Sequence, residues 1–194
     1  MERLIHATGL AMRLHADQIR KGPGTVPYYT HLWAVAALVA EYGGSQDAII
    51  AALLHDAAED QGGLATLERI RAEFGRTVAD HVAALSDTLM SPKPPWRERK
   101  LQYLQVLRTA PPETRIIAAA DKIHNIRSIL RGLRQEGSHL WNRFRGGQDG
   151  TLWYYRAVYD VLNDGWYHPI LDEYRQELSR LEQTAADHRQ CETP

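Results

Sequence analysis

The chain has 194 residues, of which 44% are hydrophobic, and a net charge of −1, which suits one domain with its own core. This charge balance excludes a general electrostatic attraction to nucleic acid or to an anionic membrane surface. The single cysteine, Cys191, excludes an intrachain disulfide and is consistent with a reducing compartment. We therefore expect a soluble, cytoplasmic protein whose partner is a small molecule, and its oligomeric state is left open.

Apolar residues recur at three- and four-residue spacing along nearly the whole chain, and alternating runs rich in Val, Ile and Thr are missing. The sequence therefore predicts an all-α fold. No apolar run has the length of a membrane-spanning helix, and the charged N-terminus lacks the apolar centre of a signal peptide. We expect one helical domain over residues 1–187, followed by a polar C-terminal tail at 188–194.

The expected helices follow from these spacings and from the glycines and prolines between them. The first helix carries Ile5, Leu10 and Leu14 and ends before the loop KGPGTVP, which leads to His31. The segment RGGQDG at 145–150 is expected to be a flexible connector. Later helices are expected, in chain order, at 31–42, 46–58, 65–74, 76–90, 96–109, 113–133, 151–163 and 168–187.

The motif AALLHDAAED places His55 and Asp56 at the end of an apolar helical stretch. A buried, charged carboxylate costs several kcal/mol unless it is paired or bound to a metal. Glu59 and Asp60 follow within about one turn, so three carboxylates and an imidazole lie on neighbouring faces of the predicted helix. Like charges at this spacing indicate a bound cation.

A second acidic position lies in the string IIAAADKIHNIRSIL, where Asp121 follows three alanines on an apolar helix. Its burial again requires a partner, and His31 supplies a further imidazole after the proline-rich loop. One divalent metal shared by His31, His55, Asp56 and Asp121 satisfies both positions. Two imidazoles and two carboxylates with open positions suit manganese better than closed tetrahedral zinc. In the alternative interpretation, Asp56 and Asp121 are surface carboxylates paired with arginines.

These motifs resemble the HD superfamily, and within it the hydrolase domain of the RelA/SpoT alarmone enzymes and small stand-alone relatives such as the metazoan SpoT homologue. The resemblance covers roughly residues 12–160. It implies an HD-type helical bundle with a metal site in a central cleft, where the residues matching His31, His55, Asp56 and Asp121 bind one divalent metal, usually manganese. The segments that carry it are HADQIRKGPGTVPYYTHL at 15–32, AALLHDAAEDQ at 51–61, RAEFGRTVADHVAALSD at 71–87 and AAADKIHNIRSIL at 118–130.

The resemblance also implies the catalytic and substrate-binding residues. Glu59 and Asp60 match a pair that orients water and manages protons, a role open to crowded carboxylates; their alternative role is that of solvated acids at a helix end. For the substrate contacts, the alternatives are solvated basic residues, a surface amide or hydroxyl, and a core aromatic. The implied substrate contacts are Arg20, Lys21, Asn125, Ser128 and Tyr154.

The expected chemistry is hydrolysis of a phosphoester or pyrophosphate, because a bound metal lowers the pKa of its water and screens the phosphate charge. The leading hypothesis is removal of the 3′-pyrophosphate from guanosine tetra- or pentaphosphate (ppGpp or pppGpp), giving GDP or GTP and pyrophosphate. One alternative is an HD phosphohydrolase for a deoxynucleotide, a dinucleoside polyphosphate or NADPH. Another is a non-catalytic module that senses a nucleotide.

The loop before His31 departs from the family pattern. The family usually has Ser-Gly-Glu between the Arg-Lys pair and Pro-Tyr, and a proline after the histidine. Here the segment reads GPGTVPYYTHL at 22–32, so that Leu32 replaces the proline. We expect an intact metal site beside a base pocket with a different wall.

Overall fold

The computed structural model describes residues 1–90 and 92–192, with the backbone alone at 190–192. Within these residues the secondary structure is helical, which confirms the all-α prediction. None of the described helices is both long enough and apolar enough to cross a bilayer. The elements are α1 (Glu2–Leu14), α2 (Tyr29–Glu41), α3 (Gln46–Leu54), α4 (Ala57–Asp60), α5 (Gly63–Phe74), α6 (Arg76–Leu85), α7 (Trp96–Arg108), α8 (Pro112–Glu136), the 3₁₀ helix η1 (Gly137–Arg143), α9 (Gly147–Asn163) and α10 (Ile170–Glu192).

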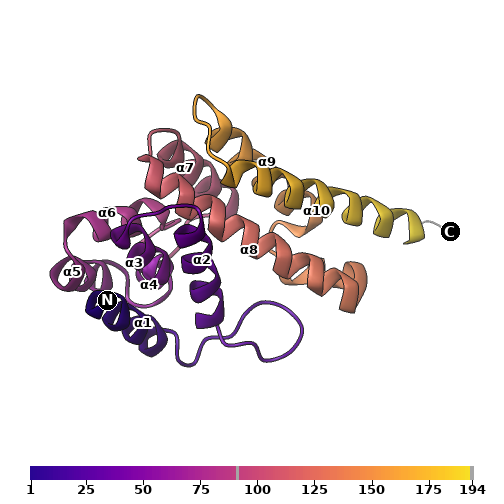
Figure 1. Cartoon of the computed structure of the whole chain (residues 1–194). Coiled ribbons are helices and arrows are strands. Elements are labelled where there is room, and N and C mark those ends of the chain that lie inside the picture. The colour runs from indigo at the N-terminus through magenta and orange to yellow at the C-terminus, as the bar shows by residue number, and fades with distance from the viewer. Residues whose placement is uncertain (91, 193–194) are drawn as a thin grey trace.

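Helix α8 is the central element of the fold. It packs against α2, α3, α6 and α10 and crosses the middle of the molecule between the N-terminal helices and the yellow C-terminal helix (Figure 1). Its segment 116–120 is buried, and the alanines at 118–120 are fully inaccessible. Small side chains let neighbouring helices approach closely, so Asp121, which directly follows them, faces the ends of α2 and α3.

The predicted helix 46–58 is wrong as a single element, because the chain turns at His55 and Asp56 between α3 and α4. The His55 ring bonds the carbonyl of Ala52 through Nδ1 at 2.8 Å. In a continuous helix that carbonyl would accept from the backbone amide of Asp56. The side chain therefore competes with the helical ladder at the point where the site needs a turn.

Three further boundaries differ from the predictions. Helix α6 ends at Leu85 and not at 90, because Ser86 is extended and its hydroxyl donates to the carbonyl of Val82. Helix α9 begins at Gly147, inside the expected connector, and the Thr151 hydroxyl bonds the Gly147 carbonyl in its first turn. The expected tail at 188–194 is helical through Glu192, whereas residues 193–194 lie outside the described part of the chain.

The chain between α1 and α2 forms a hairpin, which we define as residues 18–28. Ile19 pairs with Pro27 in an antiparallel bridge, and the Arg20 amide donates to the Val26 carbonyl at 2.9 Å. Gly24, at φ +81°, occupies a left-handed conformation that glycine adopts without a steric penalty. The hairpin projects as an open loop beside α2 (Figure 1).

Candidate metal centre and its cavity

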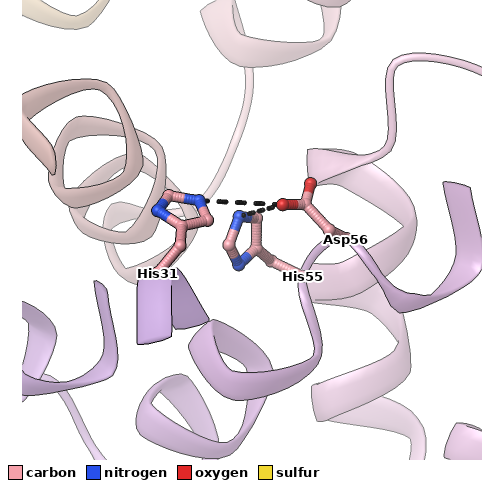
Figure 2. Close-up of side chains that lie close together, drawn as sticks. All are labelled: His31, His55 and Asp56. Atoms are coloured by element: carbon pink, nitrogen blue, oxygen red, sulfur yellow. Dashed lines mark ion pairs between the residues drawn. The ribbon is translucent and has the colours of Figure 1, made fainter. Parts of the chain in front are cut away.

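Four side chains from separate elements converge in the interior. His31 comes from α2, His55 and Asp56 from the turn after α3, and Asp121 from α8. Nε2 of His31 lies 3.2 Å from Oδ1 of Asp121 and 3.7 Å from Oδ2 of Asp56. Nε2 of His55 lies 3.0 Å from Oδ2 of Asp56 and 3.7 Å from Oδ1 of Asp121. Figure 2 shows both rings directed at one carboxylate oxygen of Asp56. We call these four residues the floor.

The floor fits a divalent cation. With its Nδ1 donating to the Ala52 carbonyl, His55 directs Nε2 at carboxylate oxygens of Asp56 and Asp121. The Nε2 atoms of His31 and His55 are buried and lack a hydrogen-bond partner. One atom each from His31, His55 and Asp56 lie within 4.8 Å of one another. Converging imidazole and carboxylate lone pairs are the donor set of a transition-metal site.

The charges of the floor favour a cation as well. Burial lowers the pKa of His31 to about 4, so this ring is neutral at neutral pH and can offer a lone pair. Burial also lowers the pKa of His55, but the adjacent Asp56 and Asp121 outweigh it and raise that pKa well above its usual range. Burial raises the pKa of Asp121, yet Lys122 and the two histidines hold it well below its usual value. The floor thus stabilises positive charge between two ionised carboxylates.

A second layer of side chains orients the floor. The Tyr28 hydroxyl donates to Oδ2 of Asp56 at 2.6 Å, and the Asn125 amide donates to Oδ1 of Asp121 at 2.5 Å. Nδ1 of His124 lies 2.7 Å from Nδ1 of His31. Burial, aided by His31 and Arg20, lowers the pKa of His124 to about 3, so this ring is neutral. When the shared proton lies on Nδ1 of His31, Nε2 of His31 is free, which is the arrangement that outer partners impose on metal-binding histidines.

The floor opens into a cavity of about 490 Å³. Asp56 and Asp121 line it, with the two imidazoles behind them. Seven basic and five acidic side chains line this cavity although the whole chain has a net charge of −1, so the wall above the floor favours an anion. We call the basic set the rim: Arg20, Lys21, Lys93, Arg99, Lys100, Lys122 and Arg145.

Glu59 and Asp60, predicted as the catalytic acids, both line the cavity beside the floor. Glu59 accepts from the Asp87 amide and from Nζ of Lys93, each at 2.9 Å. Burial and the nearby charge of Asp56 raise the pKa of Glu59, while Lys93 opposes this rise. Asp60 accepts from the Gln18 amide of the hairpin at 2.8 Å. The two carboxylates are therefore held in place by different elements.

All five residues predicted to contact substrate also line the cavity: Arg20, Lys21, Asn125, Ser128 and Tyr154. Arg20 donates to Oδ1 of Asn125 at 2.6 Å and to the Ser128 hydroxyl at 3.4 Å. Tyr154 is buried, and its ring packs against Trp96 and Tyr103, so the alternative core role describes most of its surface. Its exposed edge faces the cavity below Nζ of Lys100, which lies 4.5 Å from the ring centre.

Several cavity residues were missed in the sequence. Lys93 lies in the proline-rich segment before α7, and Arg99 and Lys100 end the basic run RERK at 97–100. Lys122 directly follows Asp121 and donates to its Oδ2 at 2.5 Å. The one available signal was this run of basic residues directly after a proline-rich segment. Tyr28 gave no signal beyond its place in the PYY string.

An all-helical bundle whose interior joins a His-Asp pair to a further histidine and aspartate defines the class of HD domains. The HD domain family matches residues 7–152, and the chain belongs to this family. Two curated relatives are the guanosine-3′,5′-bis(diphosphate) 3′-pyrophosphohydrolases MESH1 of Mus musculus and of Homo sapiens. Each is 33% identical over 131 residues, which cover 66% of this chain and 70% of the relative.

One solved structure is similar along nearly the whole chain. It is a metazoan orthologue of SpoT described as hydrolysing ppGpp. The TM-score is 0.76, and the match covers 95% of this chain and 97% of the other. At 23% sequence identity this likeness concerns the fold alone. It supports the HD-type helical arrangement independently of the sequence motifs.

Proposed function

We propose that this protein is a metal-dependent phosphohydrolase that removes the 3′-pyrophosphate of guanosine tetra- or pentaphosphate, giving GDP or GTP and pyrophosphate. The observation that carries the proposal is the joining of a cation-binding floor to an anion-binding rim in one cavity of about 490 Å³. A metal ion would match the carboxylates and imidazoles of the floor, and a phosphorylated nucleotide beside it would match the basic rim. The names of the MESH1 relatives supply the particular substrate.

The floor residues would hold the metal through Nε2 of His31, Nε2 of His55 and the carboxylates of Asp56 and Asp121. We propose manganese, since two carboxylates beside the imidazoles, with positions left open for water, suit it better than closed tetrahedral zinc. When bound, the metal supplies an acidified water and stabilises negative charge on the phosphate.

The chain's own residues manage protons and position the substrate. The raised pKa of Glu59 suits a group that accepts and returns a proton. Asp60, held by Gln18, would orient the attacking water. Lys100, Arg99 and Lys122 are placed to bind phosphate oxygens, and Arg20 to contact the base or a phosphate.

The proposal also includes a cytoplasmic location and a small nucleotide as the partner, without nucleic acid or membrane binding. The net charge of −1 supports the absence of nucleic acid and membrane binding, because the chain as a whole has no excess of basic residues to attract a polyanion.

The test is a substrate panel. Purified protein with Mn²⁺ is incubated with guanosine tetraphosphate, NADPH, a deoxynucleotide and a dinucleoside polyphosphate, and the products are separated by anion-exchange chromatography. We expect GDP and pyrophosphate from guanosine tetraphosphate, and no products after chelation. If guanosine tetraphosphate survives while another compound is cut, the substrate assignment is wrong. If it binds with Mn²⁺ and stays intact over hours, the protein is the nucleotide-sensing module.

A further inference from the structure

The Tyr28 hydroxyl bonds the one floor oxygen that both imidazoles approach. It donates to Oδ2 of Asp56 at 2.6 Å. The same oxygen lies 3.0 Å from Nε2 of His55 and 3.7 Å from Nε2 of His31. A hydroxyl in this position removes the freedom of the carboxylate to rotate away, because only one orientation of Asp56 keeps the bond.

The ring of Tyr28 is itself held from three sides. It stacks on the ring of His15 at 5.1 Å with an interplanar angle of 17°, and it meets the edge of His31 at 5.7 Å. The guanidinium of Arg20 lies over its face at 5.5 Å. His15 is fully buried and bonds Gln18 through Nδ1 at 2.7 Å, so the stacking partner has little freedom to move. These contacts therefore hold the Tyr28 hydroxyl in one position.

The hairpin connects Tyr28 with the other floor carboxylate. The Tyr28 amide donates to the Gln18 carbonyl at 2.8 Å, which joins the two strands next to the Ile19–Pro27 bridge. On the opposite strand, Arg20 donates to Asn125, which in turn donates to Asp121. One hairpin thus reaches Asp56 directly and Asp121 through one intermediate side chain.

We propose that Tyr28 is a positioning residue for the Asp56 carboxylate and that its hydroxyl couples metal binding at the floor to the order of the hairpin. This rests on the metal site of the proposed function. Outer hydrogen bonds of this kind preorganise a ligand and strengthen metal binding. Coupling between two equilibria is reciprocal, so a metal that fixes Asp56 also stabilises the hairpin that carries Tyr28.

The first measurement is the Mn²⁺ affinity of metal-free protein by isothermal titration calorimetry. Tyr28→Phe removes one oxygen, and Tyr29→Phe is the matched control, because the neighbouring Tyr29 ring packs against Trp33 at 5.0 Å, away from the floor. We expect Tyr28→Phe to raise the dissociation constant about 10- to 100-fold and Tyr29→Phe to leave it unchanged. Equal affinity in wild type and Tyr28→Phe overturns the inference while leaving the proposed function in place.

The second measurement is hydrogen exchange of the hairpin peptide with and without saturating Mn²⁺. In the wild type, Mn²⁺ should slow exchange of the Arg20 and Tyr28 amides, and in Tyr28→Phe this protection should be lost. If Mn²⁺ does not slow hydrogen exchange of the hairpin in the wild type, the coupling is wrong. This result does not depend on whether the variant folds. If the wild type binds no Mn²⁺, both the metal site of the proposed function and this inference are wrong. If it binds Mn²⁺ but the hairpin is unaffected, only this inference is wrong.

Discussion

The floor and the rim of the cavity carry opposite charge requirements. The floor is built from helix ends in the buried centre, where two carboxylates face two imidazoles whose Nε2 atoms lack a hydrogen-bond partner, so it favours a cation. The rim comes from the hairpin, the segment after α6, the start of α7, Lys122 of α8 and the chain near Arg145, and its basic groups outnumber the acids that line the cavity. Part of the rim is paired within the protein, because Arg99 and Lys100 contact Asp87 and Lys93 contacts Glu59, but basic side chains remain in excess in the cavity. The difference indicates a ligand with a metal at one end and phosphates at the other.

The largest effect is expected at the floor. Asp121→Asn keeps the side-chain shape but removes one of the two charges that oppose the imidazoles. We expect the dissociation constant for Mn²⁺ to rise by more than about 100-fold, beyond the range of outer partners, and turnover to fall to background. Calorimetry and pyrophosphate release measure the two effects. Asp80→Asn, at an exposed acid paired with Arg76, is the control and should change neither. Wild-type affinity in Asp121→Asn would remove Asp121 from the ligand set.

The next effect separates catalysis from metal binding at the junction of floor and rim. Glu59→Gln preserves the hydrogen bond from the Asp87 amide but cannot take a proton. We expect kcat to fall by about 10²- to 10⁴-fold, the usual contribution of a general acid or base, with unchanged Mn²⁺ affinity. Glu68→Gln, at an exposed position of α5, is the matched control. Loss of the metal in Glu59→Gln alone would make Glu59 a ligand and not a proton carrier.

The floor could be predicted from the sequence for a physical reason. His55, Asp56 and Asp121 lie within apolar helical segments, where an unpaired charge is costly, so their sequence context already demands a partner. The helix periodicity likewise predicted the all-α fold. The turn between α3 and α4 could not be predicted, since it depends on the His55 ring taking the Ala52 carbonyl from the backbone. Local spacing carries no signal for that competition.

Most residues of the rim could not be predicted from the sequence. Lys93 and Lys100 lie among polar and proline residues, where a basic side chain is normally solvated, and only the ending of α6 at Leu85 brings their segment over the cavity. Tyr28 was missed because its partner Asp56 is 28 residues away along the chain. Such contacts arise from the packing of distant elements, and residue spacing describes only neighbours on one element.

At the rim, we expect an effect of intermediate size on substrate binding when the pH is changed. Burial, with Lys122 nearby, lowers the pKa of Lys100 to about 7. Its charge is therefore present below pH 7 and lost above it, and phosphate binding must restore the proton. We expect the KM for guanosine tetraphosphate to rise about tenfold per pH unit above 7. Lys100→Arg stays charged throughout, so its KM should lack this rise. A constant ratio of the two KM values between pH 6 and 8.5 would show that Lys100 does not bind the substrate charge.

The smallest effect is expected at Ser128, a cavity residue whose hydrogen bond to the rim residue Arg20 is long. Its hydroxyl accepts from Arg20 at 3.4 Å, whereas Asn125 bonds Arg20 at 2.6 Å and Asp121 at 2.5 Å. A long, partly exposed hydrogen bond lies at the low end of the net range, so Ser128→Ala should raise KM less than about threefold. Asn125→Ala, measured in the same assay, should cost more because two charged groups lose a partner. A larger rise in Ser128→Ala would mean that the hydroxyl contacts the nucleotide itself and that Arg20 turns away from Asn125 when substrate binds.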